Sequence, residues 1–374
     1  MSNAPVKVSD LVARLKGRIV DGSYPAGKRI PSCRDLEHES GASHLTVFSA
    51  MKKLGKEGFL KSKGNQGTFV VKCPPFLKNV LLLSNGGDEQ KKSLFYQLFN
   101  LRIDVVARQM GRQVQRINLD VLITHPDKKA DLFTDIREHQ YEGAIILPHS
   151  LDFSGTPLDR VSGFPSIGVF NSSACTSLYT VCDSFYHRSA ALFKKAGCRR
   201  PAILLSNPQH DAAGHKEYIL RSFKPFARGM DEPHMMSFEA LNPGWIGGWI
   251  RLLYSLPANH RPDGFLVTDE NMVDETLKAI RTYGKVDPAQ VPLIRHASLV
   301  PSTKNEGPGI AIGYDVDQIC VNCFESLRLQ RSEKKSVSYA MCAVGKEEIG
   351  IPEKTTYTFT CPPIKKTTLK KNTP

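Results

Sequence analysis

The sequence predicts an α/β protein in which a small module of helices and a hairpin precedes a larger body built on parallel sheet. Three observations predict this division. Apolar residues recur at helical spacing through the first 60 residues, whereas the rest alternates short apolar runs with helical patterns. The chain has a net charge of +13, and residues 1–73 hold thirteen Lys and Arg against six Asp and Glu. The length of 374 residues suits two or three domains.

The first module begins with two predicted helices. Apolar spacing predicts an amphipathic helix over 8–21, through Val8, Leu11, Val12, Leu15 and Ile19. Turn residues from Asp21 to Gly27 end it. A second helix is predicted to start after Ser32, because Asp35 three positions later completes a capping box. Gly41 is expected to end that helix.

A third helix and a hairpin complete the module. Ser43 is the predicted N-cap, and the buried stripe is predicted to be Val47, Ala50, Met51 and Leu54. Phe48 is interpreted as a packing residue rather than a base-stacking one. Residues 68–71 are predicted to form a strand after a glycine-rich turn. Three short helices, a hairpin and concentrated basic charge are typical of a DNA-reading module whose third helix enters the major groove.

The module also resembles the winged helix-turn-helix of the gluconate-repressor (GntR) family. The matching motifs are a Pro-Ser-x-Arg helix start, a recognition helix and a Gly-Thr-Phe-Val wing, carried by Pro31, Ser32, Arg34, Gly41, Ser43, Thr46, Val47, Gly64, Gly67, Thr68, Phe69 and Val70. This resemblance implies sequence-specific DNA binding. Carried over position by position, it implies contacts to DNA from Arg34, Ser43, His44, Thr46, Lys63, Gln66 and Gly67. The two arginines usual in the family's recognition helix are replaced by His44 and Phe48, so the operator sequence cannot be borrowed from relatives.

The predicted domain boundaries follow the prolines and the charge. The winged helix is expected over 1–73, and a stiff Pro-Pro linker over 74–78. The body is expected over 79–361, and a basic disordered tail over 362–374.

The body is predicted to alternate strands and helices. Wholly apolar runs predict buried parallel strands at 80–83, 144–147, 166–169, 202–205, 265–267 and 310–312. Helices are predicted at 94–110, 186–197, 214–227, 245–256 and 271–284. Such sheets bind ligands beyond the carboxyl ends of their strands.

Three segments of the body resemble the effector domain of the lactose/galactose-repressor family, which shares its fold with periplasmic sugar-binding proteins. They are residues 181–203, residues 261–272, and residues 277–281 followed by 291–294. A GntR-type head on this body resembles the arabinose-repressor architecture. The resemblance implies two lobes joined by three crossovers, a ligand between the lobes, and a homodimer.

The family's pocket implies six ligand-binding candidates: Phe95, Asp183, His215, Trp245, Asp269 and Tyr314. Carboxylates accept hydrogen bonds from sugar hydroxyls, and a flat aromatic ring covers the apolar face of a sugar. Simpler interpretations stay open, because Asp183 and Asp269 can cap the following helices. Trp245 can belong to the core together with Trp249. His215 replaces the family's pocket arginine, and the family's later acid falls near Ala297, which leaves the ligand class open.

The remaining features exclude several classes of function. The nine dispersed cysteines indicate a reducing cytoplasm, and Cys320 and Cys323 are interpreted as core residues. No metal or cofactor is predicted, and no apolar run is long enough to span a membrane. An aminotransferase body that binds pyridoxal phosphate would need a longer chain and a recognisable lysine motif. We therefore expect a cytoplasmic, ligand-responsive transcription regulator of the repressor type. It would bind a near-palindromic operator and control carbohydrate use, or respond to another small molecule.

Overall fold

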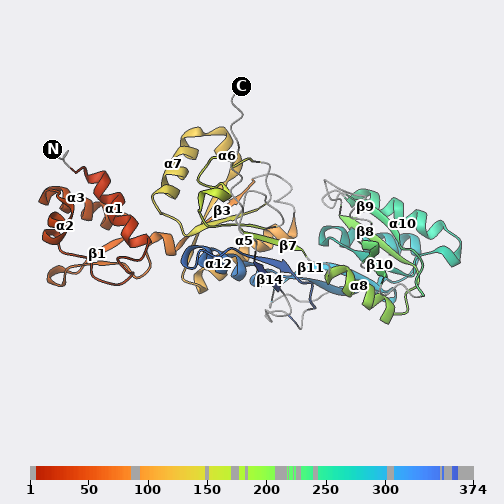
Figure 1. Ribbon diagram of the computed structural model, residues 1–374. Coiled ribbons are helices and arrows are strands. Elements are labelled where there is room, and N and C mark those ends of the chain that lie inside the picture. The colour runs from red at the N-terminus through yellow and green to blue at the C-terminus, as the bar shows by residue number, and fades with distance from the viewer. Residues whose placement is uncertain are drawn as a thin grey trace, which may run out of the picture.

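The computed structural model describes residues 6–85, 93–147, 151–169, 177–181, 184–206, 217, 219–221, 223, 224, 229–238, 243–300, 307–345, 348 and 356–360. The structure consists of three bodies that lie side by side in a row (Figure 1). We call residues 6–77 the head, the part around the seven-stranded sheet the first lobe, and the part around the five-stranded sheet the second lobe. None of the described helices is long and apolar enough to cross a membrane.

The head has the predicted order of elements: α1 (Val8–Val20), α2 (Cys33–Ser40), α3 (His44–Lys56), β1 (Leu60–Ser62) and β2 (Thr68–Val70). The capping box of Ser32 and Asp35 is present, Gly41 ends α2 at φ 67°, and the Ser43 side chain caps α3. These three predictions are confirmed. Strands β1 and β2 pair antiparallel and enclose a short 3₁₀ turn, Gly64–Gln66. The strand ends at Val70, one residue earlier than predicted.

The segment predicted as a linker contains a 3₁₀ turn, Pro75–Leu77. Phe76 is buried in the head's core, where its ring stacks on Phe59 at a centroid distance of 6.1 Å. On the other side the Arg331 guanidinium lies 5.5 Å from the Phe76 ring centroid. Since Arg331 belongs to α12 (Val316–Ser332) of the first lobe, this segment packs against both the head and the body.

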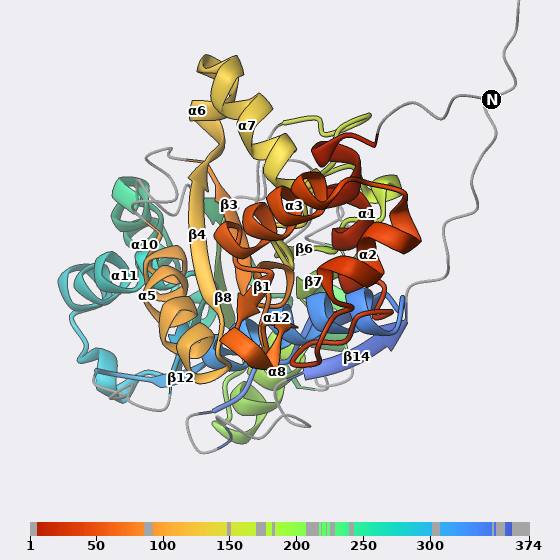
Figure 2. The ribbon, with the colours of Figure 1, turned by 90° about the vertical axis from the view of Figure 1, so that its left-hand side faces the viewer.

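The first lobe has the strand order β14-β13-β7-β6-β5-β3-β4. Its strands are β3 (Asn79–Ser84), β4 (Gln113–Asn118), β5 (Gly143–Ile146), β6 (Ser166–Val169), β7 (Ser177–Val181), β13 (Val337–Met341) and β14 (Thr356–Thr360). All pairings are parallel except that of β14 with β13. The helices are α5 (Leu94–Gln109), α6 (Leu119–Thr124), α7 (Pro126–Arg137) and α12 (Val316–Ser332). Figure 2, viewed from the head, shows α7 reaching toward α1.

The second lobe has the order β12-β11-β10-β8-β9, and every pairing is parallel. Its strands are β8 (Pro201–Ser206), β9 (His234–Phe238), β10 (Gly264–Val267), β11 (Leu293–Leu299) and β12 (Ile310–Asp315). Its helices are α8 (Ser184–Lys195), α10 (Ile246–Ser255) and α11 (Val273–Ala279), which continues into a π turn, Ile280–Gly284. The predicted helix over 214–227 falls mainly outside the described residues.

The six predicted strands are all present. The sequence prediction missed the other six strands of the body, β4, β7, β9, β11, β13 and β14. Each of them mixes polar with apolar residues, and β4, β9 and β14 also lie at the edges of their sheets. Cys320 and Cys323 are buried in α12, as predicted.

Three segments of the chain connect the lobes, as the resemblance implied. The first connection runs from β7 to α8, and the second from β12 to α12. In the third, Val344 leaves β13 and makes an antiparallel bridge to Gly313 of β12. The chain then returns to the first sheet as β14. Because β7 and β12 cross over at their carboxyl ends, the carboxyl ends of both parallel sheets face the other lobe.

Candidate DNA-binding surface and effector cleft

The outer face of α3 is apolar at its centre. Val47, Ala50 and Leu54 point into the head, which leaves Leu45 75% exposed and Phe48 54% exposed. The interpretation of Phe48 as a packing residue was therefore wrong. Positions 45 and 48 lie one turn apart on the same side of a helix, so the two side chains share one solvent-facing stripe. The stripe continues with Ser49 and Lys52, which are also exposed.

Polar candidates flank this stripe. Arg34 on α2 is exposed, and within the described part of the chain it forms no ion pair. The His44 Nδ1 atom lies 2.6 Å from Glu37 Oε1, which turns this ring toward α2. The hydroxyls of Ser43 and Thr46 share a hydrogen bond of 2.9 Å. These contacts hold the start of α3 in place. They also engage His44 Nδ1 and the hydroxyls of Ser43 and Thr46, which are the atoms that would otherwise contact DNA.

The wing carries the remaining candidates. The Lys63 ammonium lies 4.6 Å from the centroid of the Phe69 ring, so a cation–π contact positions this exposed charge. Gln66 is exposed at the tip of the turn. Gly67 has φ 98°, and a Cβ there would lie 2.6 Å from Arg29 Nε, so the turn requires glycine.

In the second lobe, polar groups gather at the carboxyl ends of β10 and β11. Glu270, just after β10, accepts hydrogen bonds from the backbone N–H of Ser298 at 2.8 Å and from its hydroxyl at 2.6 Å. The neighbouring Asp269 accepts from Asn271 through the backbone N–H at 2.9 Å and the side-chain amide at 2.8 Å. One oxygen of Asp269 therefore has the capping role that the sequence left open.

His296 on β11 lies between two aromatic rings. Its ring centroid is 5.5 Å from that of Phe185 on α8 and 5.1 Å from that of Tyr314 on β12. Burial lowers the pKa of His296, and the negative charges of Glu270 and Asp269 oppose this shift. Burial also lowers the pKa of the neighbouring Arg295, again against nearby acids. The carboxyl ends of β10 and β11 thus carry two carboxylates, a hydroxyl and an imidazole of lowered pKa.

The six predicted ligand-binding residues are placed as follows. Asp183 and His215 lie outside the described residues. Trp245 is 80% exposed in the turn before α10, whereas Trp249 takes the core position against Phe238. Phe95 at the start of α5 and Tyr314 on β12 are buried, and Phe95 stacks on Phe99.

Sequence reasoning missed the contact of Glu270 with Ser298 and the position of His296. The available signal was their place at the carboxyl ends of neighbouring parallel strands, where side chains converge. The contact itself joins residues 28 positions apart, which no local pattern reveals.

Comparisons with known proteins agree with this architecture. Residues 7–70 match the family described as bacterial regulatory proteins, gntR family. The histidine utilization repressor of Pseudomonas aeruginosa is 27% identical over 134 residues, which cover 35% of this chain and 46% of that protein. The chain thus spans less than half the length of this relative.

Two solved structures share the fold of the body. A LacI transcriptional regulator from a Rhodococcus species superposes with a TM-score of 0.51 at 13% identity, covering 71% of this chain and 95% of its own. The transcriptional regulator CelR in complex with cellobiose also gives 0.51 at 14% identity, covering 84% and 98%. The predicted fold class is therefore confirmed: the chain carries a GntR-family helix-turn-helix domain at its N-terminus, on a two-lobed body with the fold of LacI-type, periplasmic-binding-protein-like effector domains.

Proposed function

We propose that the protein is a transcription regulator that binds an operator through its head and a small effector between its lobes. The observation that carries this proposal is the union in one chain of a GntR-type head, with an exposed third helix, and a two-lobed body of the effector-binding type. Repression is the proposed direction, because the matched relative from Pseudomonas is named a repressor. A homodimer would carry two heads, so the operator is expected to be near-palindromic.

For the operator, we propose that Leu45 and Phe48 contact thymine methyl groups. In the major groove, thymine is the base that offers a methyl group, and apolar side chains recognise it. Arg34 and Thr46 would then contact base edges or phosphates beside this apolar centre. Lys63 and Gln66 would hold the backbone from the wing, which positions the head without reading sequence.

Substitution of thymine by deoxyuridine tests this proposal, since it removes the methyl groups and keeps every base pair. The operator is first selected from random duplexes with the full-length protein. Burying one methyl group is worth about 0.8 kcal/mol, so each contacted thymine should contribute roughly fourfold in affinity. Phe48→Ala should bind the thymine operator more weakly and lose its sensitivity to uracil. An unchanged uracil effect in both Phe48→Ala and Leu45→Ala would refute methyl recognition without refuting operator binding.

For the effector, we propose a neutral sugar or another small polyol. The support is the set of acceptors at the carboxyl ends of β10 and β11, the exposed ring of Trp245, and the fold shared with a cellobiose-bound regulator. The predicted contacts to this effector remain Asp183, His215, Asp269, Phe95 and Tyr314. We add His296 and Glu270 to the residues proposed to contact it. Because His215 stands where the family has an arginine, neutral sugars are expected to bind better than phosphorylated ones in this cleft.

The two tryptophans of the chain give a direct test, because Trp245 is exposed and Trp249 is buried. Sugars found in a thermal-shift screen should change the fluorescence of the wild type. Trp245→Phe should abolish this change, whereas Asp183→Asn should shift it to higher sugar concentration. A full fluorescence response in Trp245→Phe would exclude this ring from the site. Absence of any hit among sugars would favour the non-sugar alternative.

A further inference from the structure

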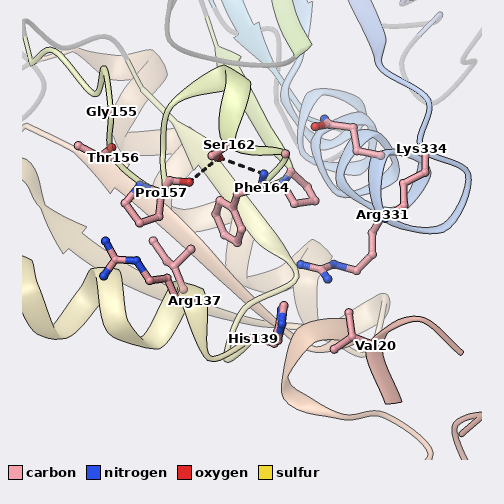
Figure 3. Close-up of a pocket in the computed structure, with 14 residues that line it drawn as sticks. Val20, Arg137, His139, Gly155, Thr156, Pro157, Ser162, Phe164, Arg331 and Lys334 are labelled. Atoms are coloured by element: carbon pink, nitrogen blue, oxygen red, sulfur yellow. Dashed lines mark hydrogen bonds between the residues drawn. The ribbon is translucent and has the colours of Figure 1, made fainter. Parts of the chain in front are cut away.

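A cavity of about 500 Å³ lies at the junction of the head with the first lobe (Figure 3). Val20 at the end of α1 lines it on the head side. The ends of α7 and α12 and the loop that leads into β6 line it on the lobe side. Since β3 begins directly after the head, this is the amino end of the first sheet. The cavity is thus at the opposite end of the lobe from the effector cleft.

The charged side chains that line the cavity all have the same sign. Its lining includes Arg137, Arg331, Lys334 and the ring of His139, and no Asp or Glu. Arg137 and His139 come from the end of α7, whereas Arg331 and Lys334 come from the end of α12. Two separate helices therefore contribute basic residues to the lining, with Arg137 on one side of the hollow and Arg331 and His139 on the other (Figure 3).

Arg331 is the least solvated of these groups. Its Nε donates to the carbonyl oxygen of Glu142 at 3.1 Å, and one terminal nitrogen donates to that of Tyr141 at 3.2 Å. The Glu142 carboxylate is already bound by Arg112, at 2.7 and 2.9 Å. Burial lowers the pKa of Arg331 to about 10, so it remains charged at neutral pH. The negative charge of Glu142 opposes this shift, but among the described residues Arg331 forms no ion pair, and a partly buried cation of this kind favours a bound anion.

The acid that lies between Arg137 and His139 in the chain has a partner of its own. Glu138 pairs with Lys16 of the head at 3.2 Å. Within the described residues, Arg137, Arg331 and Lys334 form no ion pair with any acid. Burial lowers the pKa of His139, and the positive charges of Arg331 and Lys16 lower it further, which is the response of a ring in a positive field.

Helix geometry explains part of this arrangement. His139 and Lys334 both have positive φ, 57° and 54°, just beyond the ends of α7 and α12. Glycine is the usual residue at such positions, and basic side chains there complement the helix dipole. A basic residue can end a helix and complement its dipole in this way without any cavity beside it. It does not explain why two helix ends place basic residues around the same hollow.

We propose that this junction cavity binds a small molecule bearing a phosphate group. Arg331 keeps one terminal nitrogen that donates to neither carbonyl oxygen and can donate to a phosphate oxygen, and Arg137 and Lys334 supply two further positive charges. The volume admits a small metabolite but not a nucleic acid duplex. An occupant would contact both the head and the first lobe, so it would stabilise the docked position of the head. This site is distinct from the effector cleft of the proposed function.

Calorimetry on the full-length protein tests the proposal. The probes are inorganic phosphate and glucose 6-phosphate, titrated at constant ionic strength set by chloride. Lys334→Gln should weaken binding of at least one probe about tenfold, and Arg137→Gln with Lys334→Gln should abolish it. Lys335→Gln is the matched control, because this adjacent exposed lysine does not line the cavity. Its affinity should equal that of the wild type.

Equal affinity of Lys334→Gln and Lys335→Gln for both probes would overturn the proposal, as would absence of binding to the wild type. Binding that survives in the double variant but is lost in Trp245→Ala would place the anion in the effector cleft and also overturn it. All three outcomes leave DNA binding untouched, so they are separable from failure of the proposed function. If inorganic phosphate binds more tightly than glucose 6-phosphate, the ligand is the free ion. If glucose 6-phosphate binds more tightly, the ligand is a phosphate ester.

Discussion

Replacement of Lys16 tests how the head is held together and how it is joined to the body. The Lys16 side chain is 4% exposed, and its Nζ lies 2.6 Å from Glu57 Oε2 within the head. The same nitrogen lies 3.2 Å from Glu138 Oε2 in the first lobe. Its contact with Glu57 is an ion pair rather than an aligned hydrogen bond, since that oxygen has no hydrogen-bond partner. The ammonium also lies 5.2 Å from the centroid of the Phe59 ring.

Lys16→Met keeps the length and packing of the stem and removes the charge. Breaking a buried ion pair from one side costs roughly 3–5 kcal/mol. Glu57 is 18% exposed and keeps Lys53 at 3.8 Å, so the cost should be lower, about 2–3 kcal/mol. Glu138→Gln is the matched control that removes only the junction contact. Because Glu138 is 43% exposed, this variant should lose less than about 1 kcal/mol.

The assay must follow the head separately, because both tryptophans lie in the second lobe. Far-UV circular dichroism in urea should show an early transition of the head in Lys16→Met. The tryptophan transition of the second lobe should not move. Equal stability of the head in Lys16→Met and the wild type would refute the energetic role assigned to this lysine. A parallel shift of the tryptophan signal would refute the independence of the head.

Three further predictions follow from the structure. Arg34→Ala should weaken operator binding by about 1–3 kcal/mol if it contacts a base, whereas Lys63→Ala should weaken operator and random DNA equally in gel-shift titrations. Ser32→Ala removes one half of the capping box and should lower the head's unfolding free energy by about 1 kcal/mol, with wild-type stability counting against the cap. His296 and His139 both have lowered pKa values, so below the unfolded pKa of about 6.5 the unfolded chain binds protons that the folded chain does not. Stability should therefore fall as the pH drops below about 6.5, and His296→Gln should reduce this slope in urea titrations without removing the part due to His139.

The sequence by itself determined the head almost completely. The capping box at Ser32, the end of α2 at Gly41 and the Ser43 cap are interactions between residues at most three or four positions apart. Such signals are visible in a single chain because both partners lie in one short segment. The wholly apolar strands were predictable for a related reason. A strand that is buried on both faces is a continuous run of apolar residues, which a single short segment of the sequence shows.

Only the tertiary structure decided which faces are covered. Phe48 belongs to an amphipathic helix, and its exposure follows from which face of that helix packs into the head, which its apolar character alone does not specify. Lys16 sits in a helical pattern as an ordinary polar residue, yet it is buried because Glu57 and Glu138 arrive from distant segments. Glu270 with Ser298, and Arg331 with the junction cavity, depend on the same kind of long-range assembly. The free energy of such contacts depends on the position of partners that the sequence alone does not place, which is why local patterns missed them.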